Sequence, residues 1–328
     1  MPMLAYVIRR LLLLIPMAIG MVVVTFGLLL IIPGDPAAVL LGQDATPEAI
    51  ANLRNTLGLN DPWYIRLWDY FAALLQGDMG RSIFQNQPVA EIIFGRLGAT
   101  IELAVVALLL ATLIGLTLGV LAAIRQGSWI DTVTMLFAQL GVSMPVYWLG
   151  LLLMLLFAVQ LGWLPSIGRG VPLPEAFLAA VTGRPQVLWD SISHIALPAL
   201  ALAANSAAII SRLVRASMLE VLREDFVRTA YAKGLRRGRV VIRHALRNAL
   251  LPVLSVIGLR FGALLGGAVL TESIFAWPGL GQLTIAAISQ RDLPLIQGIV
   301  LTFAIVFALV NLVVDLLYAA VDPRIRLG

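Results

Sequence analysis

Long uncharged apolar runs dominate this sequence and restrict the folds that it can adopt. Three of them, at 11–32, 103–124 and 132–161, are each long enough to cross a hydrocarbon core of about 30 Å as a helix. With 60% hydrophobic and 12% charged residues, the composition lies well outside the usual range of soluble domains. The chain is therefore predicted to be an integral membrane protein.

Three further apolar runs each contain polar residues: 192–210 with His194 and Asn205, 251–275 with Arg260 and Glu272, and 295–321 with Asp315. Together the six runs predict about six transmembrane helices and an all-α, polytopic fold. The first run is longer than the apolar core of a secretory signal peptide, about 7–15 residues, and no A-x-A-like cleavage site follows it. We therefore expect it to remain as a helix of a single transmembrane domain covering residues 1–328.

The basic residues are distributed unevenly between the segments that connect these runs. Fifteen lie on one side: at the N terminus, at Arg125, between 212 and 247, and in the C-terminal tail. The other side carries seven, namely Arg54, Arg66, Arg81, Arg96, Arg169, Arg184 and Arg291. Because cytoplasmic loops are enriched in lysine and arginine, both termini and the 212–252 segment are predicted to be cytoplasmic, and the 33–98 segment external.

The 212–252 segment also has a pattern that charge alone does not explain. Thr229 and Ala230 precede Gly234, and an apolar helical rhythm then continues over 241–252. This pattern predicts a short helix, a turn at the glycine and a second helix that leads into the next span. Small side chains allow a partner protein to approach the backbone closely, so we interpret the segment as a docking element. A nucleic-acid interpretation of its charge is disfavoured, because the loop is held between two spans.

Short motifs recur along nearly the whole chain. The docking element contains RTAYAKG at 228–234 and HALRNALLP at 244–252. The others are IPGDP at 32–36, LGLNDP at 57–62, GDMGRS at 77–82, LGWLP at 161–165, FGALLGG at 261–267, WPGLG at 277–281 and VDPR at 321–324. In order and spacing they resemble the membrane subunits of binding-protein-dependent ABC importers, in the branch of the dipeptide and oligopeptide permeases. Arg228 stands where the wider family signature usually has glutamate, which points toward this branch.

The resemblance implies the type I permease fold in the inner membrane of a prokaryote, with no catalytic residue and no cofactor in this chain. It implies a second homologous permease, two ATP-binding subunits that hold ATP and magnesium, and an extracytoplasmic solute-binding protein. The implied substrate is a di- or oligopeptide, while glutathione and nickel chelates remain open because the same branch includes their permeases. The residues implied to couple this chain to the ATPases are Arg228, Thr229, Ala230, Lys233, Gly234, Arg236 and Arg237. Arg236 and Arg237 are expected to act chiefly as exposed rim charges.

The residues themselves limit where the energy for transport is bound. Lys233 is the only lysine in the chain and alanine precedes it, so the phosphate-binding motif G-x-x-x-x-G-K-[ST] is absent. If ATP drives transport, it must therefore bind to separate subunits. Cysteine is absent and the two histidines, His194 and His244, are far apart, which argues against a disulfide framework and a metal site.

Polar residues at membrane depth are costly, about 2.5–3.5 kcal/mol near a helix centre, so each needs a physical reason. Arg260 is predicted either to line the transport pathway or to form a buried pair with Asp315. Glu272 lies nearer to the outer surface, where hydration would satisfy it, and Asn205 is a further pathway candidate. Alternatively, Arg260, Glu272 and Asp315 form the proton relay of a stand-alone secondary transporter. Neither that alternative nor an intramembrane enzyme accounts for the RTAYAKG motif.

Two other features predict protein contacts. Gly258, Gly262 and Gly266 recur every four residues, which favours close packing between helices. The aromatic residues of the 63–71 stretch predict an amphipathic helix at the membrane interface. We place the contact with a solute-binding protein on the external 33–98 segment and on the WPGLG loop.

The predicted orientation is testable by labelling, because the natural chain contains no cysteine. Single substitutions Arg54→Cys and Arg236→Cys place a thiol in the predicted external and cytoplasmic segments. On intact cells, a membrane-impermeant maleimide should label position 54 and leave position 236 unmodified until the membrane is permeabilised. Labelling of position 236 from outside would reverse the assignment.

Overall fold

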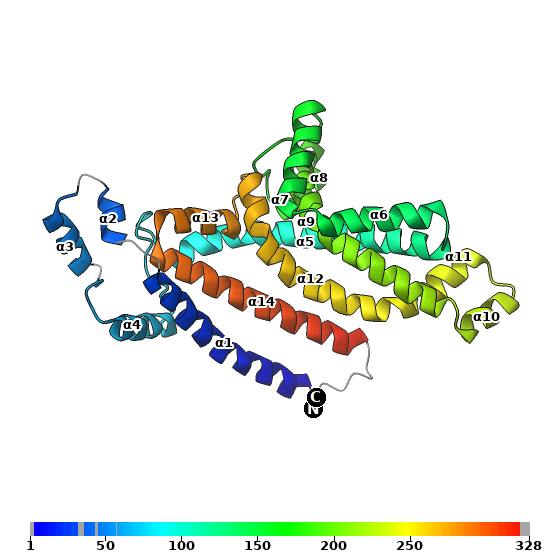
Figure 1. Ribbon diagram of the computed structural model, residues 1–328, viewed down its shortest axis with the longest axis horizontal. Coiled ribbons are helices and arrows are strands. Elements are labelled where there is room, and N and C mark those ends of the chain that lie inside the picture. Colours follow the sequence, from blue (N-terminus) through cyan, green and yellow to red (C-terminus); the bar gives the residue numbers. More distant parts are fainter. Residues whose placement is uncertain (1–2, 32–35, 43–44, 57, 322–328) are drawn as a thin grey trace. The chain divides into compact units, whose positions relative to one another are not determined.

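The computed structural model describes residues 3–31, 36–42, 45–56 and 58–321, and the chain is almost entirely helical over these residues (Figure 1). The long helices are α1 (Met3–Ile31), α5 (Val89–Ile124), α9 (Pro185–Val221), α12 (Arg247–Ile274) and α14 (Leu293–Val321). The shorter ones are α2 (Pro36–Leu41), α3 (Pro47–Thr56), α4 (Trp63–Leu75), α6 (Trp129–Ser143), α7 (Val146–Leu153), α8 (Leu173–Val181), α10 (Asp225–Ala232), α11 (Arg237–Arg239) and α13 (Leu280–Gln290), with π-helical turns η1 (Met154–Gln160) and η2 (Val240–Leu246). The all-α prediction is confirmed.

Among the described residues, four continuous helices are long and apolar enough to span a membrane: Val89–Ile124, Pro185–Val221, Arg237–Ile274 and Leu293–Val314. They correspond to four of the predicted spans. The first predicted span falls on α1, where Ile15–Gly27 is a shorter apolar helix among the residues whose side chains are described. The full number of six spans therefore stays a prediction.

The predicted span 132–161 is interrupted by a sharp bend. α6 ends at Ser143 and α7 begins at Val146, after Pro145, and the helical segments Trp129–Ser143 and Val146–Gln160 are bent by 111° relative to each other. Proline has no N–H and disfavours helical backbone in the residue before it, which explains why the helix stops here. The prediction of one uninterrupted helix is wrong in this region, although α6 and α7 together are long and apolar enough to form one broken span.

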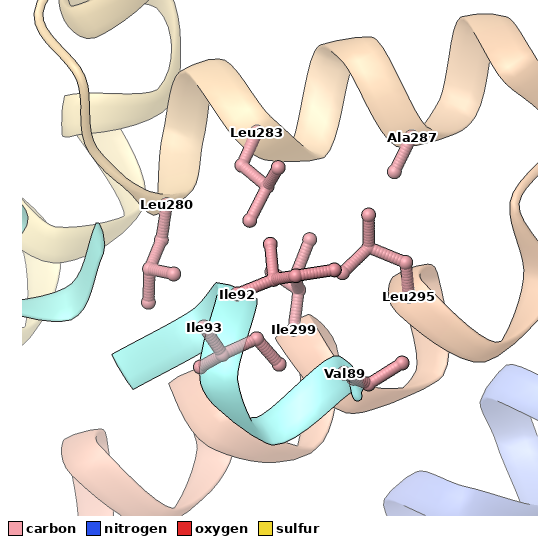
Figure 2. Close-up of a cluster of buried hydrophobic side chains, with 8 residues drawn as sticks. All are labelled: Val89, Ile92, Ile93, Leu280, Leu283, Ala287, Leu295 and Ile299. Atoms are coloured by element: carbon pink, nitrogen blue, oxygen red, sulfur yellow. The ribbon is translucent and has the colours of Figure 1, made fainter. Parts of the chain in front are cut away.

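The chain divides into two compact units. The first consists of Met1–Gly98 and Pro278–Leu312, and the second of Ala99–Trp277 together with the part of α14 that begins at Val313. Figure 2 shows the buried aliphatic cluster of the first unit, which joins the start of α5, α13 and the start of α14. Its members are Val89, Ile92, Ile93, Leu280, Leu283, Ala287, Leu295 and Ile299. Removing such a side chain from water contributes about 1.5–3 kcal/mol.

A buried carboxylate closes one end of this cluster. Asp292, in the turn between α13 and α14, is fully buried. It accepts hydrogen bonds from the Ser82 hydroxyl and from the backbone N–H groups of Ile83 and Leu295, both at 3.3 Å. Because a buried charge is tolerated only when it is hydrogen-bonded, Asp292 holds the turn that contains Ser82 against the start of α14.

α9 is the central helix of the second unit and lies against α6, α7, α8 and α12. A Cβ atom added at Gly119 of α5 would lie 2.6 Å from the Ser211 carbonyl oxygen of α9, and Gly115 is similarly confined. In α6, a Cβ atom at Gly141 would lie 3.0 Å from the Ala204 carbonyl oxygen. Glycine at these positions therefore lets the helix backbones touch, which is how helices associate in a bilayer.

The three glycines predicted to pack in α12 have different surroundings. Gly258 and Gly262 are buried, and a Cβ atom at Gly258 would lie 2.2 Å from Val314 Cγ1. Gly266 is exposed within this chain, and no described atom lies within 4 Å of the position of its Cβ. Gly258 therefore explains why α12 and α14 approach each other closely, whereas Gly266 does not contribute to packing within this chain.

This difference predicts opposite effects of the same substitution at two places in one helix. Gly258→Ala forces a methyl group into Val314 and should lower the stability of the protein by about 1–3 kcal/mol. Gly266→Ala adds only helix propensity and should be neutral or stabilising by up to about 1 kcal/mol. Thermal unfolding of the purified protein in detergent compares the two, and equal losses of stability would contradict the packing described here.

Candidate coupling site

Residues 222–240, which we call the coupling segment, form the short helix, turn and second helix that the sequence predicts (Figure 1). α10 ends at Ala232, Lys233 caps it, and the chain turns at Gly234, whose φ is 74°. Glycine adopts this left-handed conformation without the strain that a side chain brings. The chain then forms one continuous helix, Arg237–Ile274, from α11 through η2 and α12.

The coupling segment has a small hydrophobic core of its own. Val227, Ala230 and Val240 are buried, and Leu222 and Leu235 pack against them. Ala230 therefore points into the segment, and its small side chain serves internal packing, whereas the sequence pattern suggested a contact with a partner. The core holds α10 against the start of η2, so the segment is one body.

The other residues predicted to contact the ATPases are exposed: Arg228, Thr229, Lys233, Gly234, Arg236 and Arg237. Sequence analysis missed Phe226 and Tyr231, which lie on α10 and are each 42% exposed. The available signal was the presence of aromatic residues among the charged residues of a loop predicted to be cytoplasmic, since aromatic residues are enriched at protein interfaces. The ion pair between Arg228 and Asp225 joins side chains that are 79% and 95% exposed, so it adds little stability.

Two arginines connect this region to the turn between α5 and α6. Arg237 Nη2 donates a hydrogen bond to the carbonyl oxygen of Ile124, the last residue of α5, at 3.1 Å. Arg215, near the end of α9, donates two to the Asp131 carboxylate, from Nε at 2.7 Å and from Nη2 at 2.8 Å. Arg237 thus differs from the rim charge that the sequence suggested, because it holds a backbone carbonyl of another helix.

The polar residues predicted at membrane depth occupy three helices. Arg260 in α12 and Asn205 in α9 are half-buried. Glu272 in α12 is fully buried, so the expectation that hydration satisfies it is wrong. Asp315 belongs to α14, but its side chain lies outside the described residues. Its pairing with Arg260 therefore stays a prediction.

The aromatic part of the predicted external segment forms α4. Trp63 and Trp68 are 57% and 73% exposed, as expected for a helix whose aromatic residues lie at a membrane interface. The Arg66 guanidinium lies 5.6 Å from the centre of the Phe26 ring of α1. Burial raises the pKa of Tyr70 to about 12, so this phenol stays protonated at neutral pH. The interfacial position of α4 remains a prediction.

The tryptophan of the WPGLG loop is buried instead of exposed to a partner. Trp277 is 1% exposed, and its indole N–H donates to the Ala99 carbonyl oxygen at 2.9 Å. The Arg169 guanidinium lies 5.5 Å from the centre of its ring and pairs with the Glu102 carboxylate. Glu102 also accepts a hydrogen bond from the Leu173 N–H at 2.9 Å. The Trp277 side chain therefore fastens the end of α12 to α5, and the contact of the WPGLG loop with a solute-binding protein stays a prediction.

The chain matches two models of one protein family. The model described as "Binding-protein-dependent transport system inner membrane component" matches residues 115–327, and the model of the N-terminal part matches residues 3–104. The chain therefore belongs to this family of transport-system inner membrane components, as the motifs predict. It is a multi-pass inner membrane protein and a translocation subunit, with no enzymatic activity of its own.

Curated relatives match over their whole length. The dipeptide transport system permease protein DppB of Alkalihalophilus pseudofirmus is 48% identical, and the alignment covers 99% of this chain and 100% of the relative. DppB of Escherichia coli is 45% identical over 99% of both chains. The glutathione transport system permease protein GsiC of Salmonella choleraesuis is 42% identical over 99% of both chains.

Solved structures agree on the fold. A structure of the inward-facing MetNI methionine ABC transporter has a TM-score of 0.56 and 19% identity, covering 71% of this chain and 97% of that chain. An amino acid ABC transporter solved with histidines has a TM-score of 0.51 and 16% identity, covering 70% of this chain and 94% of that chain. At these identities the likeness shows the fold alone, which is the ABC importer permease fold that the motifs predict.

The inward direction of Ala230 predicts that two adjacent positions of α10 respond differently to a large side chain. Ala230→Leu overpacks the core of the coupling segment and should cost about 1–3 kcal/mol of local stability. Thr229→Leu, at the exposed neighbouring position, should leave the segment folded. Limited trypsin digestion of the purified protein measures this directly, because cleavage at Lys233 and Arg236 requires local opening of the segment. Equal cleavage rates in both variants would contradict the internal core.

Proposed function

We propose that this chain is one of two permease subunits of an ATP-driven importer that carries di- or oligopeptides across the inner membrane. The relatives named as dipeptide permeases, at 48% and 45% identity over the whole chain, support a peptide substrate. The relative named for glutathione, itself a tripeptide, is 42% identical and supports the same machinery with a different cargo. A nickel chelate is the further alternative that the branch leaves open.

The proposed assembly contains a second homologous permease, two ATP-binding subunits and an extracytoplasmic solute-binding protein. The absence of a P-loop lysine in the sequence assigns ATP and its magnesium ion to the separate subunits. The coupling segment is the part of this chain that receives them. Its exposed arginines, Lys233 and the aromatic side chains of Phe226 and Tyr231 supply a surface suited to a protein partner.

One observation carries the coupling role. The coupling segment is a compact body, and it continues directly into the 38-residue helix Arg237–Ile274. At 1.5 Å per residue such a helix is roughly 55 Å long, which exceeds the thickness of the hydrocarbon core. A displacement of α10 by the closing ATPases is therefore transmitted along a continuous helix to the external end of α12. Alternation between outward-open and inward-open cavities follows from this movement.

The turn at Gly234 provides the test of coupling. Gly234→Val places a β-branched side chain at a positive φ and should distort the turn between α10 and α11. Gly238→Val is the matched control, because Gly238 is helical and no described atom lies within 4 Å of its Cβ position. In a reconstituted complex, the first variant should assemble but lose most of the ATPase stimulation by loaded binding protein. Normal uptake by the Gly234 variant would refute the proposed function of the segment.

Uptake assays separate the remaining alternatives. Import that requires the ATPase subunits and persists when the proton gradient is collapsed supports the importer, whereas import by this chain alone would support a secondary transporter. Competition of labelled dipeptide uptake by unlabelled dipeptide, glutathione or a nickel chelate then identifies the cargo. Competition by glutathione alone would replace the peptide proposal with the glutathione alternative.

A further inference from the structure

The turn between α5 and α6 is an ordered structure built around one buried carboxylate. The Asp131 side chain is 7% exposed and accepts hydrogen bonds from Nε and Nη2 of Arg215 and from the Gly127 N–H at 3.0 Å. The Ser128 hydroxyl caps α6 by accepting from the Asp131 N–H, and it donates to the Arg125 carbonyl oxygen at 2.6 Å. Because its hydrogen bonds join the start of α6 to α9, Asp131 fixes where this turn lies.

In α9, Arg215 of the ion pair follows directly after residues that lie close to α5. A Cβ atom at Gly119 would lie 2.6 Å from both the Ser211 carbonyl oxygen and Val214 Cβ. Val214 directly precedes Arg215 in α9, so steric contact and the bidentate ion pair hold the same stretch of that helix. A bidentate pair with a planar guanidinium is more directional than a contact with a lysine. α5, α6 and α9 are thus fastened together at this end.

The coupling segment is also attached to this turn, through Arg237. Arg237, at the start of the helix that becomes α12, donates to the Ile124 carbonyl oxygen. The carbonyl groups at the C-terminal end of a helix carry partial negative charge and lack intrahelical partners, so a guanidinium there is attracted and hydrogen-bonded. Asp131 and Arg237 are therefore the links from the turn to α9 and to α12, the two helices that flank the coupling segment.

We propose that Asp131, Arg215 and Arg237 are positioning residues through which the coupling segment moves α5 and α6 together with α9 and α12. The proposal rests on the proposed function of the coupling segment. It adds that the turn formed by residues 124–131, which we call the second arm, is a further connection through which movement of the coupling segment reaches other helices. Without these links, a moving segment would act on α5 and α6 only through their packing against α9.

Arg237→Gln tests one link, with Arg236→Gln as the matched control at the adjacent exposed arginine. In reconstituted complexes, Arg237→Gln should reduce binding-protein-stimulated ATP hydrolysis and uptake several-fold per assembled complex. Arg236→Gln should have a much smaller effect, and its effect should diminish at high salt. Equal effects of both substitutions would overturn the assignment of Arg237.

Asp131→Asn tests the other link, and the exchange Asp131→Arg with Arg215→Asp asks whether the pair can be restored. Spin labels on the cysteine-free chain at Gln126 and Val181 report the position of the turn, and labels at Thr229 and Val181 report the coupling segment. In wild-type protein, ATP binding should change both distances. In Asp131→Asn and Arg237→Gln, the change at Gln126 should shrink while that at Thr229 persists, and the exchanged pair should recover part of it.

These distance measurements distinguish three cases: the second arm, the coupling function of the segment without that arm, and a role of the three residues in fold stability alone. A residue that only stabilises the fold would alter both distance changes or neither. If Gln126 moves normally in both variants and transport is intact, the second arm is refuted, while the coupling function stands as long as Gly234→Val uncouples transport. If Gly234→Val also transports normally, the proposed function itself fails.

Discussion

Backbone contact around α9 is the constraint on which the second unit depends. Lipid chains are as apolar as leucine, so apolar helices in a bilayer gain little from merely meeting, and close packing has to supply the attraction. α9 meets its neighbours with small buried residues, among them Ala203, Ala207 and Ser211. The facing helices contribute glycines, including Gly119 and Gly141, at which an added Cβ atom would collide with α9. Helices packed at this distance have few alternative positions, so they transmit displacement.

Charge is used in two ways along the chain. Three acidic side chains removed from water are paired or hydrogen-bonded: Asp131 with Arg215, Glu102 with Arg169, and Asp292 with backbone N–H groups. Breaking such a buried pair costs about 3–5 kcal/mol, because the remaining charge loses its partner. The exposed arginines of the coupling segment are available to a partner protein. These acidic residues therefore fasten the helices together, while many basic residues of the coupling segment stay exposed.

The coupling segment combines an internal core with attachments at three places. Its core holds α10 in place relative to the rest of the segment. Gly234 supplies the backbone conformation that the turn requires. Chain continuity joins the segment to α9 and α12, and Arg237 joins it to the end of α5. At the other end of α12, Trp277 and Arg169 fasten the chain to α5 again. The geometry therefore suits a body that moves several spans at once.

Sequence alone determined the features that depend on local pattern. Apolar runs specified the long helices, the RTAYAKG pattern specified a helix and a glycine turn, and the single lysine excluded a nucleotide-binding loop. These inferences succeed because helix periodicity, glycine conformation and motif chemistry are properties of neighbouring residues.

Tertiary structure alone decided which way side chains face and which charges meet. Ala230 and Trp277 look like contact residues in the sequence but are buried, because neighbours distant in the chain or across a turn cover them. Asp131 and Arg215 are 84 residues apart, and Arg237 and Ile124 are 113 apart. No local sequence pattern predicts contacts between residues so far apart, because these contacts depend on how the intervening helices pack. The parts of the candidate site that transmit movement therefore became visible only when the packing of α5, α6 and α9 was known.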